Sequence, residues 1–226
     1  MDQTLLDNPA WAALNGPQAL FAVGNGCAVR YSRELLPFAA LAEPTHTCIS
    51  ALMELTEPGE HMYLIGDLPE LPPDWQLLSS LPCTQMLLGS MPANVHSEVP
   101  ELLGPEDAAE MFELVNLVQP GYFAAGTGLL GCYYGIRHSG KLIALAGERM
   151  RLPGYVELSA IVTRPGFTGR GYARTLISKL CGVHSRQRLQ SCLHVAHSNQ
   201  RAIGIYESMG FVRRREITFH KLQWAN

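Results

Sequence analysis

The sequence has 226 residues, enough to bury a sizeable core in one large domain or in two small ones. Hydrophobic residues make up 47% of it and charged residues 16%, as in an ordinary soluble globular protein. The formal net charge of −3 disfavours a general nucleic-acid binder, because such proteins are usually basic. We therefore expect no nucleic-acid partner.

The sequence also lacks the signals of a membrane protein. No apolar run reaches the roughly 18 residues that would span a bilayer, and Met1-Asp2-Gln3 lacks the basic lead of a signal peptide. We therefore expect a cytoplasmic protein with no membrane partner.

The cysteines and histidines do not show the spacing of a metal site. His194 and His197 are three residues apart on an extended segment, so their side chains are expected to point to opposite faces. We expect no bound metal. In the expected compartment the scattered cysteines should be buried thiols rather than disulfides or zinc ligands; they are Cys27, Cys48, Cys83, Cys132, Cys181 and Cys192.

Residues 1–90 alternate short apolar runs with turn signals and repeat none of the motifs found later. They predict a small α/β lobe over residues 1–95, which ends in the turn-rich stretch Gly89–Pro100. Its expected elements are a helix opened by Asn8-Pro9, a hairpin of Ala19–Val23 with Cys27–Tyr31, a helix Thr45–Leu55 capped by Thr45, and strands His61–Ile65 and Gln85–Leu88.

Residues 96–226 predict a second and larger unit. Pro105–Val118 is expected to be a helix, because proline and two acidic residues open it and its apolar residues recur on one side. Tyr122-Phe123 then begins a glycine-rich loop. The elements that follow are strands Leu130–Arg137, Lys141–Gly147 and Tyr155–Thr163, a helix from Gly171, strand Ser191–His197, a helix that Ser198 or Asn199 can cap and that ends at Met209, and strand Phe211–Leu222.

The stretch Thr168-Gly169-Arg170-Gly171-Tyr172-Ala173 joins an apolar strand to an amphipathic helix. Two glycines at this junction let backbone N–H groups approach a ligand closely, and the helix N-terminus adds roughly half a positive charge. A phosphate group is therefore the expected ligand. The stretch lacks the Gly-Lys-Ser/Thr ending of a Walker loop and does not stand at a first strand as a dinucleotide motif does.

This turn resembles motif A of the GNAT superfamily of acyl-CoA-dependent N-acetyltransferases. Gly169 and Gly171 match that motif, while Thr168 stands where glutamine or arginine is usual. A second segment, Asn199–Phe211, resembles the superfamily's Asn-x-x-Ala-x-x-x-Tyr-Glu-x-x-Gly-Phe pattern. From about Glu98 onward the sequence is also similar to a bacterial branch related to glycine N-acyltransferase-like domains.

The resemblance implies the GNAT fold, an α/β fold of the α+β kind with a mixed and mostly antiparallel sheet. Its two central parallel strands splay apart, here Tyr155–Thr163 and Ser191–His197, and their unpaired backbone binds the pantetheine arm of acetyl-CoA. The resemblance assigns contacts with this co-substrate to Ile161, Val162, Thr163, Thr168, Gly169, Arg170, Gly171, Tyr172, Ala173, Arg174 and Asn199.

The implied reaction is direct attack of a primary amine on the thioester carbonyl. Tyr206 matches the superfamily's general acid, and a phenol with a pKa of about 10 stays protonated at neutral pH. A backbone N–H near Ile161 is the natural donor to the oxyanion. His194, Glu157 and Glu148 are alternatives for the general base, either directly or through water.

We therefore predict an N-acetyltransferase acting on a small-molecule or peptide amine, with Tyr122 and Phe123 as walls of the acceptor pocket. Two alternatives stay open. One is an acyltransferase that uses another acyl-CoA with glycine or another amino acid as acceptor, and the other is a CoA-binding regulatory module without catalysis. The N-terminal lobe would pack on the larger unit, shape its acceptor pocket or form a homodimer.

Overall fold

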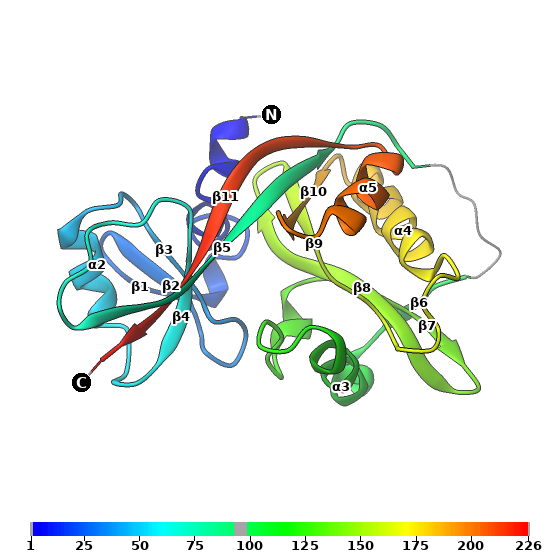
Figure 1. The fold of residues 1–226 in the computed structure, drawn as a ribbon, viewed down its shortest axis with the longest axis horizontal. Helices are drawn as coiled ribbons and strands as arrows, with labels where there is room; N and C mark the ends of the chain where they lie inside the picture. The colour runs from blue at the N-terminus through cyan, green and yellow to red at the C-terminus, as the bar shows by residue number, and fades with distance from the viewer. Residues whose placement is uncertain (1, 93–98, 226) are drawn as a thin grey trace.

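The computed structural model describes residues 2–92 and 99–225. Its strands form one mixed sheet in the order β1-β2-β3-β4-β11-β5-β10-β9-β8-β7-β6 (Figure 1). Neighbouring strands are antiparallel except β3 with β4 and β9 with β10, which are parallel. This confirms the mixed, mostly antiparallel α/β architecture that the sequence predicts.

The strands are β1 (Ala22–Asn25), β2 (Ala28–Tyr31), β3 (Phe38–Leu41), β4 (His61–Ile65), β5 (Trp75–Leu88), β6 (Glu101–Leu103), β7 (Tyr133–His138), β8 (Lys141–Leu152), β9 (Tyr155–Thr163), β10 (Gln190–Ala196) and β11 (Phe211–Trp224). The α-helices are α1 (Pro9–Leu14), α2 (His46–Met53), α3 (Ala108–Val118), α4 (Tyr172–Arg186) and α5 (Gln200–Ser208). Short 3-10 helices are Gln3–Leu6, Ala19–Phe21, Pro105–Asp107 and Thr127–Leu130. None of the helices in the described residues has the length and apolar character needed to cross a lipid bilayer.

Local sequence sets where three of the helices begin. Asn8, Thr45 and Asn199 each accept a hydrogen bond from the backbone N–H three residues later, at 3.4, 3.3 and 3.1 Å. Such a bond satisfies an N–H group that the first helical turn leaves without a partner. The predicted starts of α1, α2 and α5 are therefore confirmed.

The long strands β5 and β11 form an antiparallel ribbon that runs between the two halves of the molecule (Figure 1). The prediction of a short strand over Gln85–Leu88 is wrong about its start, because β5 begins at Trp75. Residues 76–80 are exposed on the ribbon and show no alternation of apolar and polar side chains. Their strand conformation comes from pairing with β11, which local sequence does not reveal.

The expected boundary between residues 95 and 96 falls within residues 93–98, outside the described residues. The sheet itself is continuous, since β11 lies between β4 and β5 and β5 also pairs with β10. The division into residues 1–95 and 96–226 stays a prediction. Whichever way the chain is divided, β5 serves both parts of the sheet.

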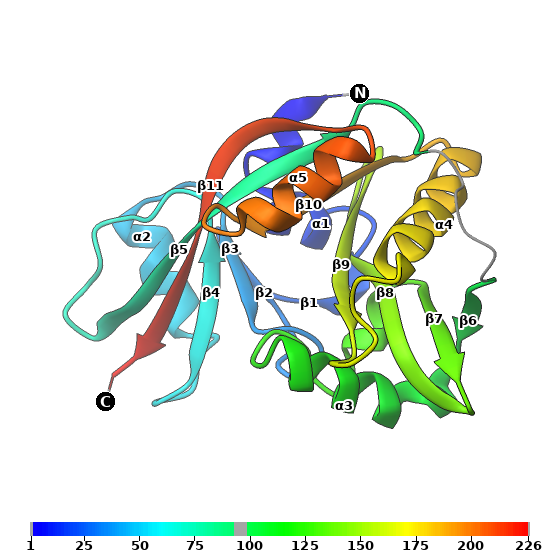
Figure 2. The same ribbon diagram turned by 45° about the vertical axis from the view of Figure 1, so that its right-hand side comes forward.

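Helices cover both faces of the C-terminal part of the sheet. Leu176 and Ile177 of α4 share a buried cluster with Leu158 of β9. Leu114 of α3 shares a different cluster with Leu145 of β8. Figures 1 and 2 place α3 and α4 on opposite sides of β8 and β9. Because both faces are covered, β8 and β9 are long buried strands from which polar groups can be presented inside the protein.

The expectation that all cysteines are thiols is wrong. Cys27, which precedes β2, and Cys48, in the first turn of α2, form a disulfide. They lie 21 residues apart and carry no spacing signal, so only the packing of the hairpin on the helix brings them together. In the described residues the free cysteines are the buried Cys83, Cys181 and Cys192 and the partly exposed Cys132.

Gly147 in β8 lies directly against the ring of Tyr133, and a Cβ built there would be 2.1 Å from Tyr133 Cδ1. Tyr133 is buried and packs edge-on against Phe123, with ring centroids 5.7 Å apart, so the ring has little room to move. We predict that Gly147→Ala lowers the free energy of unfolding by about 1–3 kcal/mol through overpacking. Urea denaturation measures this difference.

Gly204→Ala in α5 is the matched control, because no atom lies within 4 Å of the added methyl group. It should raise the free energy of unfolding by about 0.5–1 kcal/mol, since alanine is the better helix former. Equal effects of the two substitutions would contradict the packing argument.

Candidate active site

The parallel strands β9 and β10 separate partway along their length. Their pairing runs from Tyr155 opposite Gln190 to Leu158 opposite Leu193, and no later pair joins them in the described residues. Beyond this point β9 continues to pair with β8, and β10 continues to pair with β5. The predicted splay is therefore confirmed. Each strand keeps one edge whose backbone groups are open to a partner.

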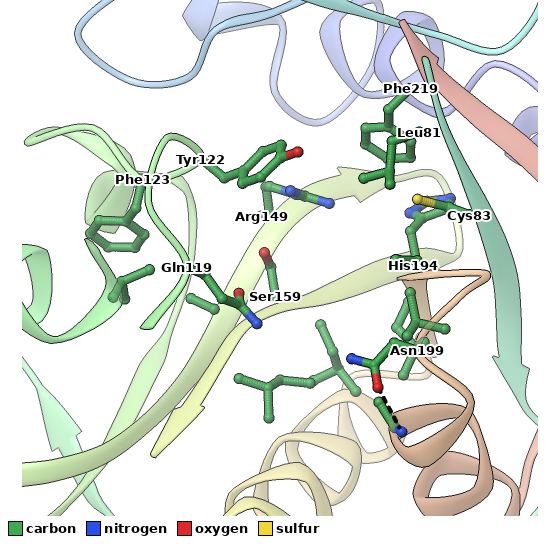
Figure 3. A pocket seen from close by; sticks show the side chains of 18 of the residues that line it. Leu81, Cys83, Gln119, Tyr122, Phe123, Arg149, Ser159, His194, Asn199 and Phe219 are labelled. Carbon is green, nitrogen blue, oxygen red and sulfur yellow. Dashed lines mark hydrogen bonds between the residues drawn. The ribbon is translucent and has the colours of Figure 1, made fainter. Parts of the chain in front are cut away.

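A cavity of about 310 Å³ lies at the splay (Figure 3). Its walls come from β9 and β10, from α5, from the loop after α3 and from the β5/β11 ribbon. It brings together six residues that the sequence singles out: Tyr122, Phe123, Ile161, His194, Asn199 and Tyr206. Val162, Thr163, Glu157 and the turn Thr168–Arg174 do not line it.

A bulge in β9 forms part of the cavity wall. On β8 the single residue between Leu145 and Gly147 faces two residues of β9, Ala160 and Ile161. Ala160 has a φ of 50°, in the left-handed region that costs an L-residue about 1–2 kcal/mol. A bulge re-aims the backbone at a strand edge. It lies where the sequence places the N–H group that would face an oxyanion.

Tyr206 reaches the cavity from α5. Its ring packs against Phe211, with centroids 6.1 Å apart and planes at 63°. Burial raises the pKa of the Tyr206 phenol to about 12, so it stays protonated through the neutral range. Its hydroxyl has no hydrogen-bond partner among residues 2–92 and 99–225, and it is free to donate to a group in the cavity.

Glu157 lies behind two residues that line the cavity, Arg149 and His194. Glu157 is fully buried, and its carboxylate accepts hydrogen bonds from Arg149 Nε at 2.9 Å, from Arg149 Nη2 at 2.5 Å and from His194 Nδ1 at 2.6 Å. Burial opposes ionisation, but the charge of Arg149 and these bonds outweigh it and lower the pKa of Glu157 to about 2. Glu157 is therefore an ionised carboxylate of low basicity.

The contacts of His194 indicate its tautomer. Nδ1 faces the Glu157 carboxylate, which can only accept, so Nδ1 carries the proton. Nε2 lies 2.9 Å from the amide nitrogen of Gln85. That amide is oriented by the Leu6 carbonyl, which accepts from its nitrogen at 2.8 Å, and by Arg214, which donates to its oxygen at 2.7 Å. Gln85 therefore donates to Nε2, and the imidazole of His194 is assigned as neutral.

Glu148, the third candidate for a base, lies away from the cavity. It is buried and contacts His184 Nε2 at 3.0 Å and Arg151 Nη2 at 3.0 Å. Successive side chains of a strand point to opposite faces, so Glu148 faces away from the cavity that its neighbour Arg149 lines. In the described residues no three His, Cys, Asp or Glu side chains gather as metal ligands would.

The turn Thr168–Arg174 leads from β9 into α4. Gly169 and Gly171 have φ values of 80° and 85°, which glycine adopts without steric cost. Gly171 caps the N-terminus of α4. The guanidinium of Arg170 lies over the Phe167 ring, 5.1 Å from its centroid. The glycines thus give the start of α4 a left-handed backbone, a conformation that occurs in anion-binding nests of consecutive N–H groups.

Some residues of the site are absent from the sequence-based prediction. Arg149, together with Glu148, interrupts an apolar strand, and this pattern is a usable signal of a buried charge pair. No such signal marks Gln85, Leu81 or Phe219. They reach the site through the pairing of β5 with β10 and β11, which joins segments far apart in the chain.

A family model described as FR47-like protein matches residues 133–220. This range contains the splayed strands, the turn Thr168–Arg174 and Tyr206. No functionally curated protein matches the sequence.

Among solved structures, the chain is similar to a protein from Novosphingobium aromaticivorans assigned to the GNAT family of acetyltransferases. The two share 34% identity with a TM-score of 0.89, over 98% of this chain and 99% of that one. A GCN5-related N-acetyltransferase from Kribbella flavida is 13% identical, with a TM-score of 0.67 over 97% and 95% of the chains. A GCN5-related N-acetyltransferase-like protein from Streptococcus suis is 14% identical, with a TM-score of 0.62 over 98% and 96%. The last two show a shared fold.

Folding lowers the pKa of Glu157 from 4.5 to about 2, so its ionised form stabilises the fold above pH 4.5 and this contribution is lost as the pH falls toward 2. In Glu157→Gln the buried charge of Arg149 loses its counter-ion. We predict that this substitution lowers the free energy of unfolding by about 3–5 kcal/mol at pH 7. The difference from the wild type should shrink by about 2 kcal/mol between roughly pH 6 and pH 3. Urea denaturation over this pH range measures it.

Glu113→Gln is the control, because Glu113 is exposed and pairs with Arg164 at the surface at 3.0 Å. Its cost should stay within about 1 kcal/mol. A Glu157→Gln difference that is the same at all these pH values would contradict a native carboxylate at this position.

Proposed function

Because the chain belongs to the GNAT family, we propose that it transfers an acetyl group from acetyl-CoA to a primary amine. Membership of this family supports acyl transfer in general, and we propose in addition that the donor is acetyl-CoA and the acceptor a primary amine. The main structural support lies at the splay, where the ladder between β9 and β10 ends at Leu158 and Leu193 and the cavity that opens there is lined by Tyr206 and His194.

Two parts of the chain would hold acetyl-CoA. The open edge of β9 at Ile161, Val162 and Thr163 would pair with the amides of the pantetheine arm, as an added strand pairs with a sheet edge. The turn Thr168–Arg174 would take the diphosphate, because its backbone N–H groups and the α4 dipole favour an anion. Asn199 caps α5 through its side-chain oxygen, which leaves its amide nitrogen available to the arm.

In the proposed reaction the amine nitrogen forms a bond to the thioester carbonyl carbon. A backbone N–H at the Ile161 bulge stabilises the oxyanion. Because the strand already holds this N–H group in position, no reorganisation is needed as the negative charge develops. Tyr206 then protonates the departing sulfur. Its raised pKa keeps the proton on the phenol until the thiolate needs it.

For the base, the geometry favours His194 over the two glutamates. Glu157 is ion-paired with a pKa of about 2, and Glu148 faces away from the cavity. The Glu157 carboxylate holds Nδ1–H of His194, so the Nε2 lone pair is the proton acceptor. Gln85 occupies that lone pair, so proton uptake requires the imidazole to exchange this bond for one to the amine or to a water. Glu157 then acts as a positioning residue.

The two alternatives predict different measurements. If the donor is another acyl-CoA, thiol release is faster with that donor than with acetyl-CoA. If the chain is a regulatory module, acetyl-CoA binds and no thiol is released with any amine.

The direct test titrates the protein with acetyl-CoA by calorimetry and then measures thiol release over a panel of amines. Absence of binding to well-folded protein would remove the proposal. In Tyr206→Phe we expect kcat to fall about 100-fold or more, because the proton donor is lost, while the Kd of acetyl-CoA changes by less than about twofold.

Tyr134→Phe is the matched control. Lys179 Nζ lies over the Tyr134 ring, 5.0 Å from its centroid, and Tyr134 does not line the cavity. It should leave kcat unchanged. Equal kcat values for Tyr206→Phe and the wild type would refute the assignment of Tyr206 as the acid.

The turn can be tested separately. A Cβ on Gly169 meets no atom within 4 Å, so Gly169→Ala changes only the backbone preference at a φ of 80°. We expect the KM for acetyl-CoA to rise about tenfold, because the left-handed turn costs alanine about 1–2 kcal/mol. Gly59→Ala is the control. Gly59 has a φ of 79° and equally open surroundings, but it is far in sequence from the turn Thr168–Arg174. It should cost similar stability and leave this KM unchanged, and a rise in both variants would argue against a diphosphate site at the turn.

A further inference from the structure

One end of the cavity carries an unusual buried cation. Arg149 is only 9% exposed, and it lines the cavity on the same side as Tyr122 and away from Asn199 (Figure 3). Its guanidinium lies 4.8 Å from the centroid of the Phe38 ring and 5.8 Å from that of Phe219. The cation is therefore held in place on its faces by aromatic rings and at one edge by Glu157.

The other edge of this guanidinium is unused. Nε and Nη2 donate to the two oxygens of Glu157, while Nη1 has no hydrogen-bond partner among the described residues. Nη1 is not among the fully buried polar atoms that lack a partner, so it is accessible from the cavity that Arg149 lines. Its N–H groups can therefore donate to water or to a ligand inside the cavity, and a ligand that accepts from them takes the place of that water.

The charges of the walls restrict that ligand. None of the residues that line the cavity in the described part of the chain is an aspartate, a glutamate or a lysine, and Arg149 is the sole permanently charged one. A polycationic acceptor would bring positive charge to a wall without a carboxylate. A carboxylate on the acceptor would instead meet the planar fork of an arginine, which suits it in shape and charge.

We propose that Arg149 binds a carboxylate of the acceptor, so that the acceptor is a small amine carrying a carboxylate, of which α-amino acids are the simplest. This inference rests on the proposed acyl transfer. A zwitterionic amino acid adds no net charge to a site in which Arg149 and Glu157 already balance. The part of the acceptor that lies inside the cavity must also be small, because the cavity of about 310 Å³ has to admit the acyl end of the donor as well.

The proposed step balances as follows. The ammonium group of the bound amino acid first loses one proton to solvent. The neutral amine nitrogen then bonds to the thioester carbonyl carbon, the carbon–sulfur bond breaks, a second proton of the nitrogen passes to His194, and Tyr206 protonates the sulfur. The proton on His194 restores Tyr206 through solvent. The products are an N-acetyl amino acid and CoA, and the carboxylate stays bound to Arg149 throughout.

The test compares matched acceptors by thiol release from acetyl-CoA. Two sets suffice: glycine, glycinamide and methylamine, then phenylalanine, phenylalaninamide and phenethylamine. We expect kcat/KM for an amino acid to exceed that for its amide and its simple amine by about 10-fold or more. Independently of any variant, propionate should compete with the acceptor in the wild type and propionamide should not.

Arg149→Lys keeps a positive charge beside Glu157 but loses the planar fork. It should raise the KM for the amino acid by about 10- to 100-fold and change that for the amide by less than about twofold. Arg151→Lys is the control, because Arg151 lies on the same strand, is partly exposed and does not line the cavity. It should alter neither value.

The outcomes separate the two proposals. If no amine in either set is acetylated, both the acyl transfer and the carboxylate site fail. If amides and simple amines react as well as the amino acids, or propionate and propionamide compete equally, the carboxylate site is overturned while acyl transfer stands. If Arg149→Lys changes KM equally for the amino acid, its amide and its simple amine, the carboxylate site is likewise overturned.

Discussion

The carboxylate of Glu157 holds three strands together where the main-chain ladder ends. Glu157 lies on β9, and its oxygens accept hydrogen bonds from Arg149 on β8 and from His194 on β10. The backbone pairing of β9 with β10 stops one residue later, at Leu158. Side-chain bonds therefore fix the separation of the strands at the mouth of the splay. The strand edge beyond Leu158 is thereby left open to a ligand.

A buried ion pair is expensive, because both charges leave water. Here the cost is offset by hydrogen bonds to both oxygens of Glu157 and by the rings of Phe38 and Phe219 beside the Arg149 guanidinium. The same bonds that stabilise the carboxylate lower its basicity. The Glu157 carboxylate is therefore suited to orienting His194 through Nδ1 and is a poor proton acceptor itself.

The two ends of the cavity draw on different parts of the chain. The proposed co-substrate end, with Ile161, Asn199 and Tyr206, lies within residues 133–220, the range of the FR47-like match. The proposed acceptor end combines Arg149, inside that range, with Leu81 from β5 and Tyr122 from the loop after α3, which lie outside it. Tyr122 is itself supported by Tyr63 of β4, with ring centroids 5.0 Å apart. Residues from the N-terminal part of the chain thus line or support the end of the cavity where we propose that the acceptor binds.

The sequence by itself determined the features that depend on neighbouring residues: the left-handed turn at Gly169 and Gly171, the capped start of α5 and the place of Tyr206 on that helix. Caps and turns form from a few consecutive residues, so their signals are local. Only the tertiary structure decided the length of β5, the disulfide of Cys27 with Cys48, and which candidate base lies at the cavity. Each of these depends on the register and packing of strands distant in sequence. Glu148 and Arg149 are adjacent in one strand and lie on opposite faces of the sheet, so Glu148 contacts His184 while Arg149 lines the cavity.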